Sequence, residues 1–348
     1  MATKRQNSPP YDQNNRYKRR LLRTLKVTLD YPLRFQPKFR QYIWGGRRLG
    51  TELGKPIDAE GVFAESWEVV DHGDDQSVVA NGPLAGKTLG ELVRRHGEQL
   101  FGSHQATEQF PLLFKFLDAN TDLSIQVHPD DAQAALLDPP DLGKTEAWVI
   151  MDAEPGARMF VGLKANVDRD TLRQAIEQNQ LIDHMHIIEP KAGDCVFIRA
   201  QTVHALGKGL LVAEIQQSSN TTYRLFDWNR TDAAGNSRPL HIQQSLETID
   251  FAQGPVLLQT PIAVAPSVER LVECDKFVLD RLCLTEAGAS GGDDRFHILS
   301  VLNGAVTVEH PAGEFELGKG ETMLLPAASS AVTLVPRCPS TLLDMYLP

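Results

Sequence analysis

Residues 123–129, Leu-Ser-Ile-Gln-Val-His-Pro, form a strand-like run with no charged side chain. Alternate residues of a strand share a face, so Ser124, Gln126 and His128 are expected to point the same way. The apolar residues of the run are expected on the opposite face: Leu123, Ile125 and Val127. A polar face without charges is typical of the lining of a small barrel, and Pro129 then ends the pairing.

Glu146 follows 18 residues after His128, within the segment 143–148, Gly-Lys-Thr-Glu-Ala-Trp. A histidine, a carboxylate and the neighbouring amide oxygen of Gln126 can form the beginning of a zinc site. The spacing is equally compatible with surface residues or with hydrogen-bonded core residues, because it constrains the geometry only weakly. At this stage both interpretations stand.

Three further polar residues lie within or directly after apolar strands. In segment 193–206 a Gly-Asp turn leads into an apolar strand, and a loop then delivers His204. The alternation in 210–217 places Glu214 in mid-strand, where a charge is costly unless it faces a wet cavity. Lys115 lies in a dense apolar run, so it either extends its amine to the surface or faces a polar cavity.

Local patterns predict three helices, and Thr88 with Glu91 is expected to form a capping box at the start of the first. The predicted helices span 88–100, 130–137 and 168–178. Two hairpins are also predicted: one over 147–161, and one in which Asn303-Gly304 joins strands 296–302 and 305–308. His184 and His186 follow the third helix and are expected to face solvent, with a site role as the alternative.

Composition narrows the class of protein. The chain has 348 residues, 42% of them hydrophobic and 23% charged, which is ordinary for a globular protein with room for two domains. The net charge of −10 argues against a nucleic-acid partner, and no apolar stretch is long enough to span a membrane. Four cysteines without a C-x-x-C pattern are expected to be reduced, as in a cytoplasmic protein.

The charge and the patterns divide the chain into three parts. Residues 1–26 carry eight lysines and arginines against Asp12 alone, and we expect a disordered tail or residues added by an upstream start codon. The pattern of 193–200 returns at 320–327, but the second copy has no histidine where His204 would fall. We therefore expect a site-bearing domain over 27–253 and a structural, metal-free one over 254–348. Many short strands and Gly-rich turns predict a mainly β protein with two jelly-roll barrels and a few added helices.

Five motifs together resemble the type I mannose-6-phosphate isomerases of the cupin superfamily, and in particular their shorter bacterial branch. The similarity extends from about residue 33 to the C-terminus, without the extra helical domain of the longer enzymes. The motifs are Glu-Ser-Trp-Glu at 65–68, Leu-Ser-Ile-Gln-Val-His-Pro at 123–129, Gly-Lys-Thr-Glu-Ala-Trp at 143–148, Thr-Val-His-Ala at 202–205 and Tyr-Arg-Leu-Phe-Asp-Trp at 223–228.

The resemblance implies roles for individual residues. One Zn²⁺ per chain would be held by Gln126, His128, Glu146 and His204. The catalytic residues would be Arg224, Glu214 and Lys144. The sugar phosphate would be bound by Ser124, Lys115 and Lys144.

The implied reaction is the reversible isomerisation of D-mannose 6-phosphate to D-fructose 6-phosphate through a cis-enediol(ate). The implied partner is a sugar phosphate, with no nucleic acid and no membrane, and the chain is expected to be a monomer or weak homodimer. Two other functions remain open: a different metal-dependent cupin enzyme, and a non-catalytic sugar-binding cupin.

Overall fold

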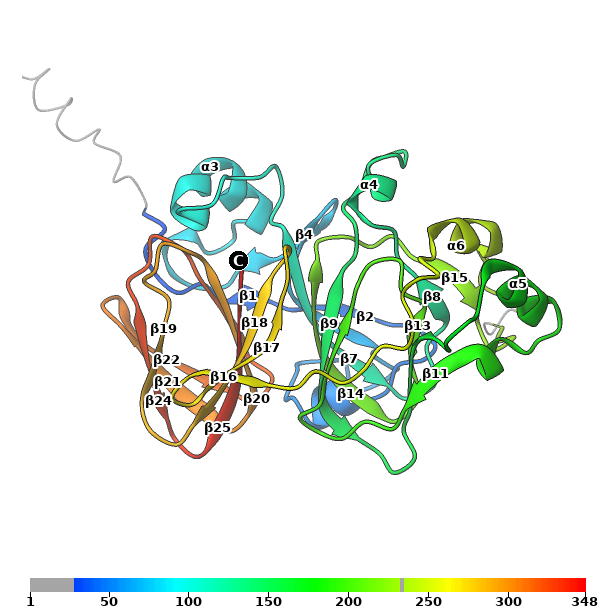
Figure 1. The fold of residues 1–348 in the computed structure, drawn as a ribbon. Coiled ribbons are helices and arrows are strands. Elements are labelled where there is room, and N and C mark those ends of the chain that lie inside the picture. Colours follow the sequence, from blue (N-terminus) through cyan, green and yellow to red (C-terminus); the bar gives the residue numbers. More distant parts are fainter. Residues whose placement is uncertain (1–27, 232–234) are drawn as a thin grey trace, which may run out of the picture.

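A computed structural model describes residues 28–231 and 235–348, so the basic segment 1–26 lies outside the described residues. The protein is mainly β, as predicted, and its longer strands form two pairs of antiparallel sheets that lie side by side (Figure 1). The first pair has a five-stranded sheet, β11 (Met185–Ile188), β10 (Met159–Leu163), β13 (His204–Leu206), β8 (Ile125–Val127) and β15 (Tyr223–Phe226). Its six-stranded sheet is β12 (Cys195–Ile198), β9 (Glu146–Ala153), β14 (Leu210–Gln217), β7 (Leu112–Ala119), β3 (Glu65–Val69) and β2 (Lys38–Arg40).

The second pair is built from the C-terminal strands. Its six-stranded sheet is β16 (Ile262–Ala265), β17 (Val268–Glu273), β18 (Val278–Leu284), β25 (Ser340–Tyr346), β20 (His297–Asn303) and β23 (Thr322–Leu325). Its four-stranded sheet is β19 (Gly288–Ser290), β24 (Val332–Pro336), β21 (Ala305–His310) and β22 (Gly313–Gly318). Two small ladders join β1 (Phe35–Gln36) to β6 (Val78–Val79) and β4 (Asp71–His72) to β5 (Asp75–Gln76).

Apolar side chains on the facing sides of the sheets form a separate core inside each pair. In the first pair, Ile150 and Val212 of the six-stranded sheet pack with Val161 of the five-stranded sheet. In the second pair, Val301 packs in the same core as Val308. This alternation of inward and outward residues is what the sequence patterns of the strands predict.

The two six-stranded sheets also pack against each other through their outer faces. Phe114 of β7 and Ala213 of β14 share one buried cluster with Leu279, Ile298 and Met345 of the second pair. The central strands of both sheets are therefore buried on two sides, and the two halves form one continuous body.

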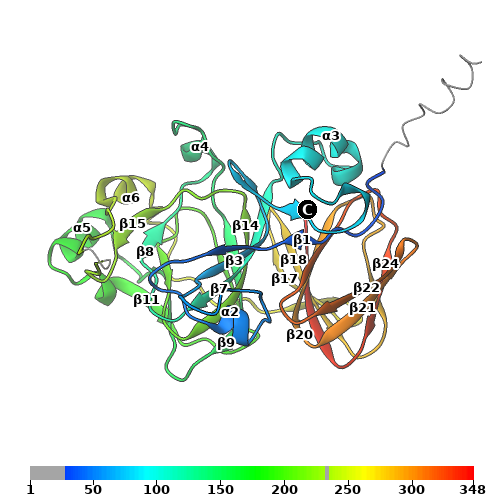
Figure 2. The same ribbon diagram turned by 180° about the vertical axis from the view of Figure 1, so that it is seen from behind.

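Segments from early in the chain lie on the second pair of sheets, as the view from behind shows (Figure 2). Leu33 exchanges backbone hydrogen bonds with Leu324, and the Ala327 amide donates to the carbonyl of Leu100 at the end of α3 (Leu89–Phe101). The rings of Phe110 and Phe296 lie 4.6 Å apart, centroid to centroid. The N-terminal part of the chain thus joins the two halves.

The helices largely follow the predictions. The capping box is confirmed, since Thr88 Oγ1 accepts from the Glu91 amide at 3.1 Å and the Glu91 carboxylate accepts from the Thr88 amide at 3.0 Å. The helix predicted at 130–137 is shorter, because Leu136 is 87% exposed and offers no buried face for another turn. The other helices are α2 (Arg48–Thr51), α4 (Asp131–Ala134), α5 (Arg169–Glu177), α6 (Ile242–Thr248), η1 (Gly82–Leu84) and η2 (Leu181–His184). No helix in the described ranges is long and apolar enough to cross a membrane.

Both predicted hairpins are wrong for the same reason. β9 pairs with β12 and β14, whereas the following strand β10 belongs to the opposite sheet. β20 and β21 likewise belong to different sheets, and Gly304 makes the corner between them with a φ of +79°. A Cβ at Gly304 would lie 2.4 Å from Ser340 Oγ, so glycine is needed for close approach as well as for the turn. These turns send the chain from one sheet to the other.

The predicted internal repeat has a structural counterpart. Gly193 and Gly320 both have positive φ, at +92° and +83°. Each precedes an edge strand of a six-stranded sheet, β12 in the first pair and β23 in the second. The repeated sequence pattern therefore corresponds to a repeated position in the fold.

Candidate metal centre and substrate pocket

Three buried side chains converge between the two sheets of the first pair. His128 follows β8, His204 begins β13, and Glu146 begins β9 of the opposite sheet. One donor atom from each residue lies within 4.8 Å of the others, which makes the three a group that could hold a metal ion. Glu146 bridges the histidines, with Oε2 3.7 Å from Nε2 of His128 and Oε1 3.3 Å from Nε2 of His204.

Backbone carbonyls orient both imidazole rings. Nδ1 of His128 lies 2.8 Å from the Thr221 carbonyl, and Nδ1 of His204 lies 2.8 Å from the Thr202 carbonyl. A carbonyl only accepts, so each Nδ1 carries the hydrogen and each Nε2 presents a lone pair to the cluster. Burial, reinforced by the charge of Lys144, lowers the pKa of His128 well below its usual value and that of His204 to about 3. Both rings are therefore neutral, as metal ligands must be.

The donor set suits a divalent cation. Oε1 of Glu146 is buried and has no hydrogen-bond partner in the described part of the chain, although a buried carboxylate oxygen ordinarily has one. The positive charge now in the cluster is the amine of Lys144, which contacts the Glu146 carboxylate and lies 2.9 Å from Nε2 of His128. Two neutral imidazoles and a carboxylate around a cationic position fit Zn²⁺ and similar metals.

Gln126 is placed beside the cluster as the strand alternation predicts. Its side-chain amide lies 3.4 Å from Nε2 of His204, and it pairs with His204 across β8 and β13. The nitrogen and oxygen of an amide are assigned from hydrogen bonding, so turning the group would direct Oε1 toward the cluster. All four residues predicted as ligands thus lie together.

A polar pocket of about 160 Å³ opens over the cluster. Every residue predicted to bind or transform the substrate contributes to its wall: Lys115, Ser124, Lys144, Glu214 and Arg224. Lys115 therefore faces a polar cavity rather than extending to the surface.

Glu214 is held by several partners at the side of the pocket. Its Oε2 accepts from the indole N–H of Trp148 at 3.1 Å, and its Oε1 lies 3.2 Å from Nζ of Lys115 and 3.7 Å from Nζ of Lys144. Burial alone would lower the pKa of Lys115, but Glu214 and then Glu65 outweigh it, so the pKa is raised. Lys115 therefore remains a cation.

Arg224 lies opposite Gln126 in the β15–β8 ladder and reaches the same pocket. Its Nε is buried and has no hydrogen-bond partner among residues 28–231 and 235–348. Burial, and then the neighbouring Arg238, lower the pKa of Arg224 from its usual value, yet a guanidinium remains charged at neutral pH. Arg224 thus places a permanent cation in the wall of the pocket.

One predicted position is wrong, and some pocket residues were missed. Leu123 was expected beside Ile125 and Val127 on the outer face, but it lies in the core between the sheets, because β8 begins only at Ile125. The missed polar and aromatic wall residues include Tyr42, Trp44, Glu65, Asn220, Thr222 and Arg238. Glu65 could have been found from its place in the Glu-Ser-Trp-Glu motif at 65–68. His184 and His186 are not part of the metal-binding group.

The fold and the site are those of a cupin protein with a metal-binding cluster, and comparison with known proteins agrees. Residues 33–144 match the family described as phosphomannose isomerase type I, catalytic domain, and residues 267–339 match the mannose-6-phosphate isomerase cupin domain. The probable mannose-6-phosphate isomerase GmuF of Bacillus subtilis is 35% identical over 312 residues, covering 89% of this chain and 98% of that protein. The mannose-6-phosphate isomerase of Streptococcus mutans is 37% identical over 298 residues, covering 85% and 92%.

A solved structure shows the same relationship. The crystal structure of the mannose 6-phosphate isomerase from Bacillus subtilis superimposes with a TM-score of 0.84 at 31% identity, covering 91% of this chain and 99% of that one. The chain belongs to the type I phosphomannose isomerase family.

Proposed function

We propose that this protein catalyses the reversible isomerisation of D-mannose 6-phosphate to D-fructose 6-phosphate with one Zn²⁺ per chain. The observation that carries the proposal is the buried group of His128, Glu146 and His204 beneath a pocket that also presents Arg224 and Glu214. The membership of the family adds the substrate, because the relatives named above are mannose-6-phosphate isomerases.

The metal would be held by Gln126, His128, Glu146 and His204. A bound divalent cation would supply Lewis-acid stabilisation of the negative charge that develops on the sugar oxygens. The carbonyls of Thr221 and Thr202 orient the two imidazoles, which is the usual task of groups behind metal ligands.

The phosphate would be bound by Lys115, Ser124 and Lys144. Glu214 and Glu65 keep Lys115 in the pocket wall as a cation, and Lys144 brings a second amine. The Ser124 hydroxyl makes no hydrogen bond to another described residue, so it is free to donate to a substrate oxygen. A point charge with a nearby hydroxyl donor is a common way to recognise phosphate.

The reaction moves a proton between C2 and C1 of the sugar. Glu214 is the proposed base and acid, since its carboxylate is buried beside the pocket and oriented by the Trp148 N–H. Arg224 would stabilise the enediolate with its planar, permanently charged group. Lys144, between Glu146 and Glu214, is the second candidate for handling the proton.

The decisive experiment is a coupled assay on mannose 6-phosphate, with and without a chelator, together with metal analysis of the purified protein. We expect turnover that the chelator abolishes and Zn²⁺ restores, and one metal ion per chain. The His128→Ala variant should lose both metal and turnover. Oxygen consumption with bound iron would favour a different cupin enzyme, and metal-independent sugar binding without turnover would favour a binding protein.

We also propose a cellular location and an oligomeric state for the protein. The four cysteines are free, as expected for a protein of the cytoplasm, and we propose that location. We further propose that the chain acts as a monomer or weak homodimer, which the sedimentation velocity of the purified enzyme would test.

A further inference from the structure

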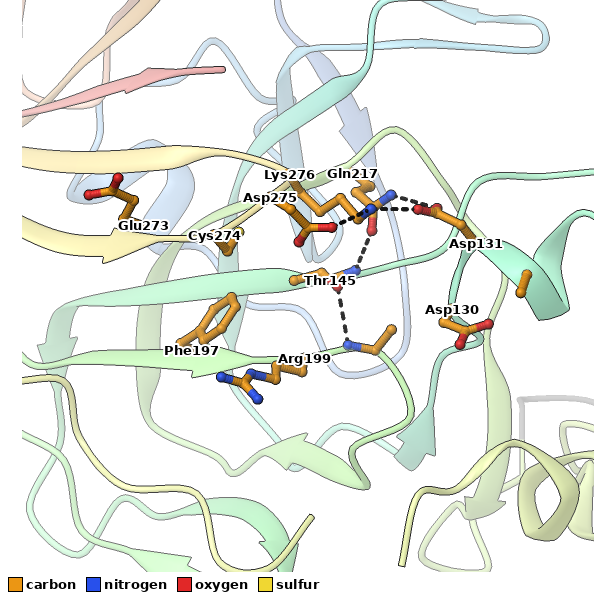
Figure 3. Close-up of a pocket in the computed structure, with 12 residues that line it drawn as sticks. Asp130, Asp131, Thr145, Phe197, Arg199, Gln217, Glu273, Cys274, Asp275 and Lys276 are labelled. Carbon is orange, nitrogen blue, oxygen red and sulfur yellow. Dashed lines mark hydrogen bonds and ion pairs between the residues drawn. The ribbon is translucent and has the colours of Figure 1, made fainter. Parts of the chain in front are cut away.

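A second and larger cavity, of about 560 Å³, lies between the two halves of the molecule and is lined by Thr145, the neighbour of Glu146 (Figure 3). One wall comes from the first half, through α4, Thr145 and the loop before β13. The other wall is the turn between β17 and β18, which carries Cys274 and Lys276. The cavity therefore marks where the second pair of sheets approaches the segments that carry the proposed ligands.

Asp131 is the centre of a hydrogen-bond network at this junction. Its Oδ1 accepts from the Gly143 amide and from the side-chain amide of Gln217, both at 2.8 Å. Its Oδ2 lies 2.7 Å from Nζ of Lys276, which comes from the second half. Figure 3 shows Lys276 and Gln217 side by side, both reaching Asp131.

The network continues from Gln217 toward the other ligand segments. Oε1 of Gln217 accepts from the Thr145 amide at 3.1 Å, and Thr145 Oγ1 accepts from the Ala200 amide at 3.3 Å. Thr145 precedes Glu146, Ala200 lies four residues before His204, and Asp131 lies three residues after His128. One chain of hydrogen bonds thus ties together the three segments that deliver the cluster.

Lys276 supplies the positive charge of this network. Within the described ranges it is the only cation in an ion pair with Asp131. Their side chains are 27% and 45% exposed, so the pair adds little to overall stability. Its effect is on position, because the carboxylate that it holds also holds Gly143, the neighbour of Lys144.

We propose that Lys276 is a positioning residue through which the C-terminal half sets the geometry of the metal centre. Loss of its charge frees Asp131 to leave Gly143 and Gln217, so the segments bearing His128 and Glu146 are less well fixed. The inference rests on the proposed function in one respect, that His128, Glu146 and His204 bind the metal.

The test compares full-length variants by their affinity for Zn²⁺, measured by competition with a chromophoric chelator, and by kcat and KM on mannose 6-phosphate. Lys276→Met should weaken Zn²⁺ binding about tenfold, the lower end for groups behind the ligands, while Lys276→Arg retains the wild-type affinity. Arg281→Met is the matched control, because Arg281 also crosses between the halves, donating to the Gly193 carbonyl at 2.7 Å, but lies outside the network. Wild-type affinity in Lys276→Met, or equal weakening in Arg281→Met, would overturn the proposal.

A double-mutant cycle of Lys276→Met with Asp131→Asn tests whether Lys276 acts on the proposed metal site through Asp131. If Lys276 acts through Asp131, Lys276→Met should cause little further loss in the Asp131→Asn background. Full additivity of the two changes would contradict that route. A wild-type protein that binds Zn²⁺ without isomerising mannose 6-phosphate would refute the proposed function and leave this inference standing, because the affinity measurement needs no turnover.

Discussion

Nζ of Lys144 lies 2.9 Å from Nε2 of His128 and contacts the carboxylate of Glu146 at the same time. An ammonium group thus occupies the space between two of the proposed ligands. A divalent cation binding there has to displace it, and the nearby Glu214, at 3.7 Å, offers an alternative partner. Metal binding and the position of Lys144 should therefore be coupled.

Lys144→Met tests this coupling. Removal of the competing positive charge should leave Zn²⁺ affinity equal to or tighter than that of the wild type. The kcat/KM on mannose 6-phosphate should fall by about 100-fold or more through loss of a group proposed to bind the substrate and handle the proton. Chelator competition and the coupled assay measure the two effects. Lys208→Met, at an exposed lysine, should change neither. Weaker Zn²⁺ binding in Lys144→Met would show that the amine supports the metal site instead.

Arg224→Lys should separate chemistry from metal binding. Lysine keeps the charge but cannot present the planar fork, so kcat should fall about 100- to 1,000-fold, the usual loss for a transition-state donor. The metal content should stay at the wild-type level, because Arg224 is not a proposed ligand. Arg337→Lys, at an exposed ion pair of the second half, should behave as wild type. An Arg224→Lys enzyme with an unchanged rate would remove Arg224 from the mechanism.

Glu214→Gln tests the proposed base. The amide cannot accept the C2 proton, so turnover and the exchange of that proton with solvent deuterium should both fall by about 100- to 10,000-fold. Trp148→Phe removes the N–H that orients the carboxylate and part of a buried ring but leaves the carboxylate in place, so its loss of kcat should be smaller. Isotope exchange followed by NMR measures both. Persistent exchange in Glu214→Gln would transfer the role to another group, Lys144 first.

His297 should make stability depend on pH in the second half. Its Nδ1 lies 2.7 Å from Asp344 and its Nε2 3.0 Å from Asp293, and its ring packs on Tyr346, over which Arg295 also lies. Burial lowers the pKa of His297, but Asp344 and then Asp293 outweigh it, so the pKa is raised above 6.5.

The direction of this pH dependence follows from the linkage between protonation of His297 and folding. A histidine whose pKa is higher in the folded state stabilises that state fully below pH 6.5, and the contribution is lost as the pH rises through the folded pKa. Urea unfolding of the wild type and of His297→Gln should therefore differ more at pH 6 than at pH 9. An equal difference at both values would mean that His297 is neutral when folded. The comparison with the variant cancels the effects of other groups, such as His72.

The sequence predicted the site better than the connections between strands. Alternation placed Gln126 on one face with Ser124 and His128, because period two is a local property of a strand. The cost of a charge in mid-strand indicated a wet cavity for Glu214, whereas for Lys115 the surface remained an alternative. Glu146 and His204 needed the resemblance to a family, since spacings of 18 and 58 residues carry no geometry by themselves. The hairpins failed because local residues encode a turn but not which sheet receives the next strand.

The wall residues that were missed depend on long-range assembly. Tyr42 and Arg238 reach the pocket from segments about 200 residues apart, and no local pattern marks either of them. Lys276 reaches Asp131 from the other half of the molecule in the same way. Such contacts follow from how the sheets stack, which only the complete fold determines.

The packing of the two six-stranded sheets against each other has a consequence for any truncated form of the protein. A premature stop codon near residue 253 would leave Phe114 and its neighbours on β7, β9 and β14 as an uncovered apolar wall. An exposed apolar surface of this kind binds other chains or chaperones. The truncated protein should therefore precipitate, although it contains every proposed ligand. The C-terminal half should thus also keep the half that carries the proposed ligands soluble.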